Sequence, residues 1–390
     1  MTLAAIAIDW AIGDPRWPTH PVIWIGRLIG RLESWLRRSE REPASGTKIA
    51  SETGAGRIPA ASGTSPEIVA IGVGAAENVA GVAEAAAARS ATAGGGFYPS
   101  VQPAARPGER RRPSPGALRL KGAVLAFVTV GVSFAAMWAL WAAAHRLHPW
   151  LGYAVNVWFI SATVAVKGLK DAALSVYGRL KDGDLEGARF CVGQIVGRDT
   201  DRLDEPEVVR AAVETVAENT GDAVVAPLFY ALLGGAPLAM LYRAANTLDS
   251  MLGYKNAKYV HFGWASARLD DALNFVPARL AGLLIIVWCA FVPGLSARRS
   301  YRAVRVFARL HPSPNSGVPE AAVAGAMGVR LGGENRYGGV VSRRAYLGWP
   351  LTPLNREHIA LAVRILYGVS YLIAGGLIGV WIAFRLTAPG

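Results

Sequence analysis

Long apolar blocks constrain this chain more than any other feature of its sequence. From Gly122 to Ala144 there is no charged side chain, and Arg119 and Lys121 stand just before the block. A helix rises 1.5 Å per residue, so about 20 such residues cross the hydrocarbon layer of a bilayer. Over 390 residues, 52% are hydrophobic, and they gather in further blocks of this kind. The pattern therefore predicts a membrane protein.

The further apolar blocks are Trp150–Val166, Ala223–Leu241, Leu280–Leu295 and Ile359–Phe384. The second of these contains Pro227, Gly234, Gly235 and Pro237, so a helix there should be kinked or broken. No stretch shows the clear alternation of a strand. We therefore expect an all-α, polytopic integral membrane protein with four or five transmembrane helices. Polar helical segments between them would form a site at the membrane edge.

The net charge of +13 limits the partners of the chain. In a protein with membrane spans, Lys and Arg collect in cytoplasmic loops, so the charge predicts contact with membrane lipid. No nucleic-acid-binding motif occurs, and no nucleic-acid partner is expected. The two cysteines, Cys191 and Cys289, lie far apart and form no metal-ligand pair. The N-terminus lacks a basic segment before its apolar part, so we expect no cleaved secretory signal.

Composition divides the chain into three parts. Residues 1–41 hold an N-terminal motif and a predicted amphipathic helix over Pro21–Leu36. Residues 42–116 are rich in Ala, Gly, Pro and Ser, and this composition cannot bury enough apolar surface to offset the entropy of ordering. We expect a largely disordered insertion there, with one Ala-rich helix around Ile68 to Arg89. Residues 117–390 are the predicted membrane-embedded catalytic domain.

The stretch VETVAENTGDAVVAPLFY sets four polar residues against an apolar run. Glu214 and Glu218 are four apart and share a helix face, and Asp222 follows near the helix end. Paired carboxylates bind Mg²⁺, which usually brings substrate phosphates. The alternative is an acidic helix face in which Glu214 pairs with Arg210 at the i−4 position. The motif alone leaves both interpretations open.

Two more clusters of acids and amides follow. In YRAANTLDSMLGYKN, Asn246 and Asp249 share a helix face. In ARLDDALNFVPARL, Asp270 and Asp271 precede Asn274. Each cluster lies at the edge of an apolar block, where ionisable groups are candidates for function. One shared site explains the three clusters better than three separate solvated faces.

The segment HPSPNSGVPEAAVAGAMGVRLGGENRYGG adds His311 and several other polar residues. Its glycines, Gly332, Gly333, Gly338 and Gly339, permit close backbone approach to a ligand, and backbone N–H groups in such loops can hold phosphate. Plain turns are the alternative. His311 is a candidate general base or a structural histidine. Near the N-terminus, Asp14 and His20 in GDPRWPTHP are either site residues or turn caps.

Together these segments resemble the adenosylcobinamide-phosphate synthase family of cobalamin biosynthesis (CobD/CbiB). The resemblance rests on GDPRWPTHPVIWIGRLI, on GRDTDRLDEPEVVRAAVETVAENTGDAVVAPLFYALLGGAP, on YRAANTLDSMLGYKN, on FGWASARLDDALNFVPARL and on the His311 segment. It covers nearly all of the chain outside residues 42–116. The chain departs from the family in that insertion, which is longer than the connector expected there.

The resemblance implies an integral inner-membrane enzyme, with an active site that we expect to face the cytoplasm. Such an enzyme joins adenosylcobyric acid to aminopropanol or its O-phosphate through an amide bond. Activating the carboxylate implies ATP as co-substrate and Mg²⁺ as cofactor. The implied partners are a corrinoid, a small amino-alcohol phosphate, membrane lipid and other membrane enzymes of the pathway.

On this basis we assign three hypothetical roles. Catalytic roles are predicted for Glu214, Glu218, Asn219, Asp222, Lys255 and His311. Substrate or phosphate binding is predicted for Asp14, His20, Arg198, Arg243, Tyr254, Arg279, Asn315, Ser316 and Glu320. Metal binding is predicted for Asp222, Asn246, Asp249, Asp270 and Asp271.

Two alternative functions stay open. A membrane prenyl- or alcohol-phosphate transferase would use similar acidic motifs to hold Mg²⁺ and diphosphate, and Asn246/Asp249 fits that pattern locally. The HPSPNS and GDPRWPTHP segments do not fit it. A non-enzymatic membrane sensor of related fold is the other alternative, but it would not need three intact acidic clusters.

Overall fold

The computed structural model describes residues 1–13, 20–38, 113–254 and 256–387. Of the predicted insertion, residues 42–112 lie outside this part of the chain, as does the Ala-rich helix expected around Ile68 to Arg89. The helices are α1 (Thr2–Ala11), α2 (Pro21–Leu36), α4 (Pro115–Leu147), α5 (Pro149–Ser161), α6 (Val166–Lys181), α7 (Leu185–Gly193), α8 (Glu205–Thr220), α9 (Ala226–Leu252), α10 (Trp264–Leu273), α11 (Phe275–Cys289), α12 (Ala297–Phe307), α13 (Gly317–Met327) and α14 (Glu357–Thr387). The strands are β1 (Leu331–Tyr337) and β2 (Val340–Leu347).

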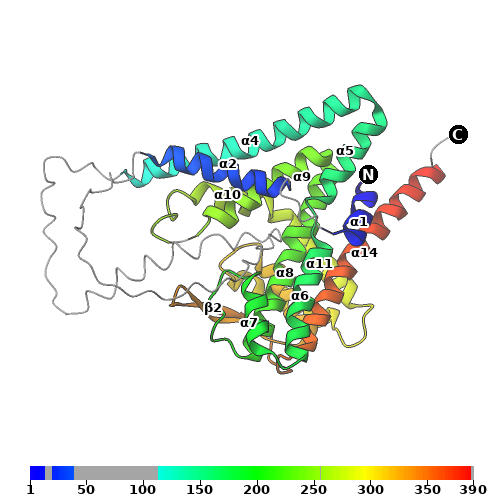
Figure 1. The fold of residues 1–390 in the computed structure, drawn as a ribbon. Helices are drawn as coiled ribbons and strands as arrows, with labels where there is room; N and C mark the ends of the chain where they lie inside the picture. The colour runs from blue at the N-terminus through cyan, green and yellow to red at the C-terminus, as the bar shows by residue number, and fades with distance from the viewer. Residues whose placement is uncertain (14–19, 39–112, 255, 388–390) are drawn as a thin grey trace, which may run out of the picture.

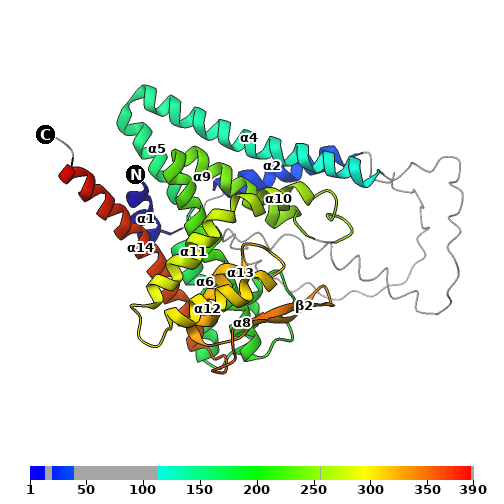
Figure 2. The same ribbon diagram turned by 180° about the vertical axis from the view of Figure 1, so that it is seen from behind.

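Two groups of helices make up the fold. Figure 1 shows α2 and α10 lying along α4 on one side, and α6, α8, α11 and α14 packed together below them. From behind, α12 and α13 cover this lower group beside the strands (Figure 2). The α4–α5 turn and the C-terminal end of α14 project on the same side of the molecule in both views.

The long apolar helices confirm the expected fold class. Four helical stretches are long and apolar enough to cross a membrane, and a fifth counts if the bent pair Trp264–Leu273 and Phe275–Cys289 forms one span. The four are Pro115–Leu147, Pro149–Lys181, Glu205–Leu252 and Glu357–Thr387. The amphipathic helix predicted from sequence is also present over Pro21–Leu36.

Local sequence signals explain where these helices begin. The Ser114 side chain accepts a hydrogen bond from the Ala117 N–H, and Pro115 occupies the first turn of α4. Asp204 caps α8 in the same way, by accepting from the Glu207 N–H at 2.9 Å. A side-chain oxygen at the cap accepts from a backbone N–H that has no partner within the helix. Proline in the first turn costs no hydrogen bond, because the N–H that it lacks would have had no partner within the helix.

The predicted break in the third apolar block lies at two glycines of α9. Gly234 has φ −160° and ψ 28°, and Gly235 has φ 66° and ψ −157°, a conformation that is essentially restricted to glycine. Beyond the break, the Tyr242 phenol donates a hydrogen bond to the Asp222 carbonyl at 3.0 Å. In a straight helix these residues would be roughly 30 Å apart. The chain therefore folds back at the glycines, and Ala226–Leu233 and Pro237–Leu252 form the two arms of a helical hairpin.

A β-hairpin replaces the loop expected at the glycine-rich segment. β1 pairs antiparallel with β2, and Tyr337 pairs with Val340 across a two-residue Gly338–Gly339 connection. Both glycines have positive φ, 56° and 79°, which matches the twist that such a short hairpin turn requires. The prediction missed the strands because LGGENRY is rich in glycine and polar residues and has no apolar alternation.

Candidate active site

Five half-buried carboxylates from three sequence motifs lie within electrostatic range of one another. We call them the carboxylate cluster; its members are Glu218, Asp222, Asp249, Asp270 and Asp271. The charges of Asp270, Glu218 and Asp249 all act on Asp222. Asp271 in turn acts on Asp249 and Asp270. The fold-back of α9 makes this possible, because it returns Asp249 to the level of Asp222. The structure thus brings the three acidic motifs of the sequence to one place.

A network of amides and a phenol holds Asp270. Its two carboxylate oxygens accept from Asn274 Nδ2 at 3.0 Å and, more weakly, from Asn246 Nδ2 at 3.4 Å. The buried Asn274 also accepts from the Tyr242 hydroxyl at 2.9 Å. Tyr242 joins this network to the Asp222 carbonyl. The orientation of Asp270 is therefore determined by the second arm of the α9 hairpin and by the α10–α11 junction.

Asp222 sits where the helix is irregular. Residues Gly221–Val225 form a single π-helical turn between α8 and α9. Such turns insert an extra residue into a helix, weaken its regular hydrogen bonding and occur frequently at functional sites. Here the turn places the Asp222 side chain toward the cluster while its carbonyl binds Tyr242.

The donor set of the cluster suits Mg²⁺, which prefers carboxylate and amide oxygens. Within the described ranges, however, no three His, Cys, Asp or Glu side chains are gathered closely enough to hold a metal ion by themselves. Mg²⁺ characteristically uses one or two carboxylates and fills its remaining positions with water and phosphate oxygens. The geometry therefore fits a metal that arrives with a phosphate ligand better than a resident all-protein metal site.

Two arginines bring positive charge to this region. Arg243 is only 2% exposed and acts electrostatically on Asp222. Arg279 is more exposed and donates to the Asn315 side chain at 2.8 Å and to the Phe275 carbonyl at 2.8 Å. Asn315 in turn donates to the Asp271 carbonyl at 2.8 Å. Arg279 and Asn315 thus fasten the loop before α13 onto the α10–α11 junction.

That loop and α13 form a second polar wall against Glu218. The Ser316 hydroxyl donates to Glu218 Oε1 at 2.9 Å and lies 3.2 Å from the Ser313 hydroxyl. His311 Nδ1 lies 3.0 Å from the Ser313 N and 3.2 Å from the Ser313 carbonyl oxygen. His311 Nε2 lies 3.5 Å from Glu320 Oε1.

Burial controls the protonation of this wall. Burial raises the pKa of the Glu320 carboxyl well above its usual range, and the charges of Glu218 and Glu214 raise it further. Burial also lowers the pKa of His311, against an opposing effect of Glu218. Both groups are therefore favoured in their neutral forms. A neutral histidine beside a protonated carboxylic acid can exchange a proton with a bound ligand.

Glu214 occupies a different environment. It forms ion pairs with Arg198 and, at 3.2 Å, with Arg210, and it accepts from the Gly332 N–H at 2.7 Å. The two arginines also bind the Asn335 side-chain oxygen, at 2.6 and 3.0 Å. These contacts attach the β-hairpin to α8. The i−4 pairing with Arg210 is thus present, and the contacts of Glu214 and Arg198 are those of an anchor.

The glycine-rich segment does not offer the phosphate-binding N–H groups that the sequence suggested. The Gly332 N–H is bound to Glu214. The Gly338 and Gly339 N–H groups both donate to the Asp199 carboxylate, at 2.8 and 2.7 Å. That expectation was wrong for these three glycines, because internal carboxylates already occupy their donors.

The remaining predicted residues lie at the edge of the candidate site or outside the residues that the structure describes. Asn219 donates to the Thr215 carbonyl of its own helix at 2.9 Å. His20 caps α2, where its Nδ1 accepts from the Val22 N–H. Burial raises the pKa of the Tyr254 phenol, and the nearby charge of Asp249 adds to the effect. Asp14 and Lys255 lie outside the described residues.

Sequence reasoning missed three residues of this region. Tyr242 connects Asn274 to the Asp222 carbonyl, yet the sequence predicted no role for it in the segment YRAANTLDSMLGYKN. Asn335 lies on a strand that was not predicted, and its side-chain oxygen accepts hydrogen bonds from Arg198 and Arg210. Arg344 of β2 lies within electrostatic range of Glu320 and His311. A polar residue in a short strand gives no sequence signal that would distinguish it from a solvated one.

Comparison with known proteins finds one matching family model, described as CobD/Cbib protein, over residues 2–107 and 97–366. The cobalamin biosynthesis protein CobD of Geobacter metallireducens is 38% identical over 373 residues, 96% of this chain and 93% of the relative. The cobalamin biosynthesis protein CbiB of Salmonella typhimurium is 44% identical over 386 residues, 97% of both chains. No solved structure matches this chain significantly.

Proposed function

This chain belongs to the CobD/CbiB family, and we propose that it is a cobalamin-biosynthesis enzyme that forms an amide bond. The names of its relatives support a role in cobalamin biosynthesis. The proposed reaction joins adenosylcobyric acid to aminopropanol or its O-phosphate, with ATP and Mg²⁺. The observation that carries the enzymatic proposal is the carboxylate cluster, where motifs far apart in sequence converge beside the buried Arg243.

The proposed reaction has two steps. The corrinoid carboxylate attacks the γ-phosphorus of ATP, which yields an acyl phosphate and ADP. The amine nitrogen then attacks the acyl carbon, the carbon–oxygen bond to phosphate breaks, and the ammonium loses its proton. Mg²⁺, held with the phosphates, would neutralise charge on the transferred group.

The residues of the chain would share the other tasks. One or two of Asp222, Asp249 and Asp270 would bind Mg²⁺ together with phosphate oxygens and water, because these three lie in the cluster and are only half buried. Arg243 would counter the charge that develops on phosphate. Glu218 is the proposed acceptor of the proton that the amine releases, since it lies in the carboxylate cluster and the Ser316 hydroxyl orients it through a hydrogen bond of 2.9 Å.

We further propose that the site faces the cytoplasm from the inner membrane, where ATP and the corrinoid are available. The long apolar helices establish only that the chain fits a membrane protein. Association with other membrane enzymes of the pathway would shorten the route of the corrinoid, which is the substrate of one enzyme and the product of another.

The reaction can be tested directly on purified protein in detergent. The protein is given adenosylcobyric acid, aminopropanol phosphate, ATP and Mg²⁺, and mass spectrometry follows the corrin amide while a coupled assay follows ADP. We expect one ADP per amide. A folded preparation that forms no corrin amide would overturn the proposal. If the products were AMP and diphosphate, the activated intermediate would be an acyl adenylate and not an acyl phosphate. Transfer of a prenyl group from a prenyl diphosphate would favour the alternative function, a membrane prenyl- or alcohol-phosphate transferase.

A further inference from the structure

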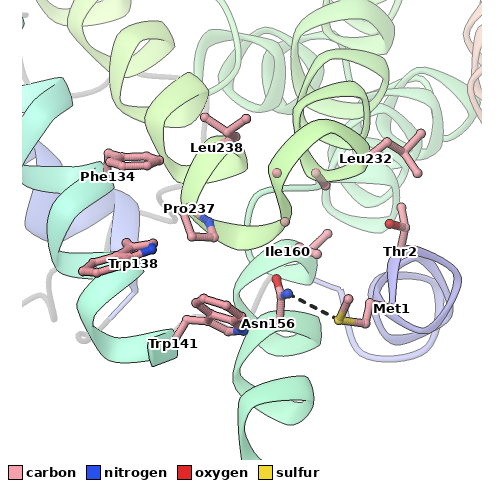
Figure 3. A pocket seen from close by; sticks show the side chains of 13 residues that line it. Met1, Thr2, Phe134, Trp138, Trp141, Asn156, Ile160, Leu232, Pro237 and Leu238 are labelled. Atoms are coloured by element: carbon pink, nitrogen blue, oxygen red, sulfur yellow. Dashed lines mark hydrogen bonds between the residues drawn. The ribbon is translucent and has the colours of Figure 1, made fainter. Parts of the chain in front are cut away.

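A cavity of about 560 Å³ lies at the tip of the α9 hairpin, away from the carboxylate cluster. Figure 3 shows its walls: Phe134, Trp138 and Trp141 of α4 on one side, Asn156 of α5 below, and Leu232 across the opening. The broken backbone at Gly234 and Gly235 also lines it. Almost all of these residues come from candidate membrane spans.

The cavity opens toward the lipid-facing side. Trp138 is 54% exposed and Leu232 is 52% exposed, although both are large apolar residues within candidate spans. Side chains of this kind face hydrocarbon in a bilayer. Aromatic and aliphatic walls offer water few hydrogen bonds, so water is a poor occupant. A molecule that enters from this side comes from the membrane.

One polar group in the cavity needs a partner. Asn156 is 5% exposed, and its Oδ1 accepts from the Ala236 N–H at 2.6 Å, which satisfies a donor freed by the helix break. Its Nδ2 carries two protons and donates to the Met1 thioether sulfur at 3.3 Å, which is a weak acceptor. An amide proton without a good acceptor is costly in an apolar environment. The cavity therefore suits an apolar ligand that carries one hydrogen-bond acceptor.

We propose that this cavity binds one acyl chain of a glycerophospholipid, with its ester carbonyl accepting from Asn156 Nδ2. The chain lies against Phe134 and Trp138, and the ester group sits near the level of the interfacial aromatics. Trp141 stacks on His145 at 5.5 Å at the end of α4 that meets α5, which marks this end as the headgroup side. The bound chain braces the break of a hairpin whose first arm follows the π-helical turn with Asp222 and whose second arm carries Asp249.

Photolabelling in nanodiscs tests the proposal on the full chain. A phosphatidylcholine with a diazirine on one acyl chain is photolysed, and labelled peptides are measured by mass spectrometry. We expect labels enriched in the peptides that contain Phe134–Trp141 and Leu232–Leu238, relative to the exposed end of α14 around Trp381. Asn156→Leu should reduce that labelling by about fivefold, the effect of losing one hydrogen bond. Trp381→Leu, a matched change on the lipid-facing surface, should leave it unchanged.

A second comparison needs only the wild-type protein, in case Asn156→Leu does not fold. An ether-linked lipid has the same chain without the ester carbonyl, so it should label the cavity about fivefold less than the ester lipid. Uniform labelling of all exposed apolar helices, or equal labelling by ester and ether lipids, would show annular lipid only and overturn the proposal.

Discussion

The Tyr242 hydroxyl lies 3.0 Å from the backbone carbonyl of Asp222, although 20 residues of helix separate them in sequence. The rings of Tyr230 and Tyr242 also stack, with centroids 5.3 Å apart, and so join the two arms of the hairpin directly. Both contacts exist only because the chain reverses at Gly234–Gly235. That reversal assembles the candidate site, since Asp249 would otherwise lie far from Asp222. The hairpin thus connects a backbone break within a candidate membrane span to the polar chemistry at its base.

Gly235→Ala should destabilise the protein and weaken the candidate site. Gly235 has φ 66°, and an added Cβ would lie 2.9 Å from Asn156 Oδ1. We expect a loss of about 1–3 kcal/mol, the cost of a non-glycine residue in this conformation. The measurement is thermal unfolding in detergent. Gly131→Ala is the control, because no atom lies within 4 Å of its added Cβ. An unfolding midpoint equal to that of the control would contradict the reversal.

Asp249→Asn should weaken the binding of Mg²⁺ with ATP by at least about tenfold, because it removes one of the few carboxylates available to the metal. Mn²⁺ can replace Mg²⁺, and its paramagnetic signal in the presence of a non-hydrolysable ATP analogue reports binding independently of turnover. Asp182→Asn, an exposed change at the end of α6, is the control. Unchanged Mn²⁺ binding in a folded Asp249→Asn protein would remove this residue from the metal site.

Glu214→Gln should cost about 3–5 kcal/mol of stability, since it removes the carboxylate partner of the buried Arg198 guanidinium and leaves Arg210 paired with Glu207 alone. Denaturant unfolding measures the loss. Asp201→Asn breaks the exposed pair with Arg202 and should cost no more than about 1 kcal/mol. If Glu214→Gln abolished turnover while leaving stability intact, Glu214 would be a catalytic group and not an anchor.

Glu320→Gln should make stability less dependent on pH. The native pKa of Glu320 is raised from 4.5, so above pH 4.5 the native state keeps a proton that the unfolded state releases. Stability is therefore lost as pH rises from that value through the native pKa, at up to about 1.4 kcal/mol per pH unit. Glutamine has no such proton to lose.

The unfolding midpoint of Glu320→Gln, relative to wild type, should accordingly rise between pH 5 and pH 8. The groups facing Glu320 are His311, Glu218, Glu214, Arg344 and Arg198, and all are kept in both proteins. His311 has a lowered pKa, so it destabilises both proteins alike as pH falls below 6.5. A constant difference in midpoint across this range would show that Glu320 is ionised in the native protein.

The sequence alone determined the local features of this protein. Long apolar blocks identify α4 and α14, and an amphipathic repeat identifies α2, because each signal is complete within one helix. The break at Gly234–Gly235 was also predictable, since glycine and proline act on their own backbone. The acidic motifs indicated one shared site before their arrangement was known.

Only the tertiary structure decided how these local features combine. A broken helix can bend by any angle, and the packing of α9 against α4 and α5 selects the reversal that brings Asp249 to Asp222. The β-hairpin depends on Glu214 and Asp199, which bind its glycine N–H groups from elsewhere in the chain. The same distant contacts pair Glu214 with two arginines and the Gly332 N–H, whereas Glu218 lies in the carboxylate cluster. Spacing along one helix cannot distinguish two carboxylates on the same face, because their partners arrive from other elements.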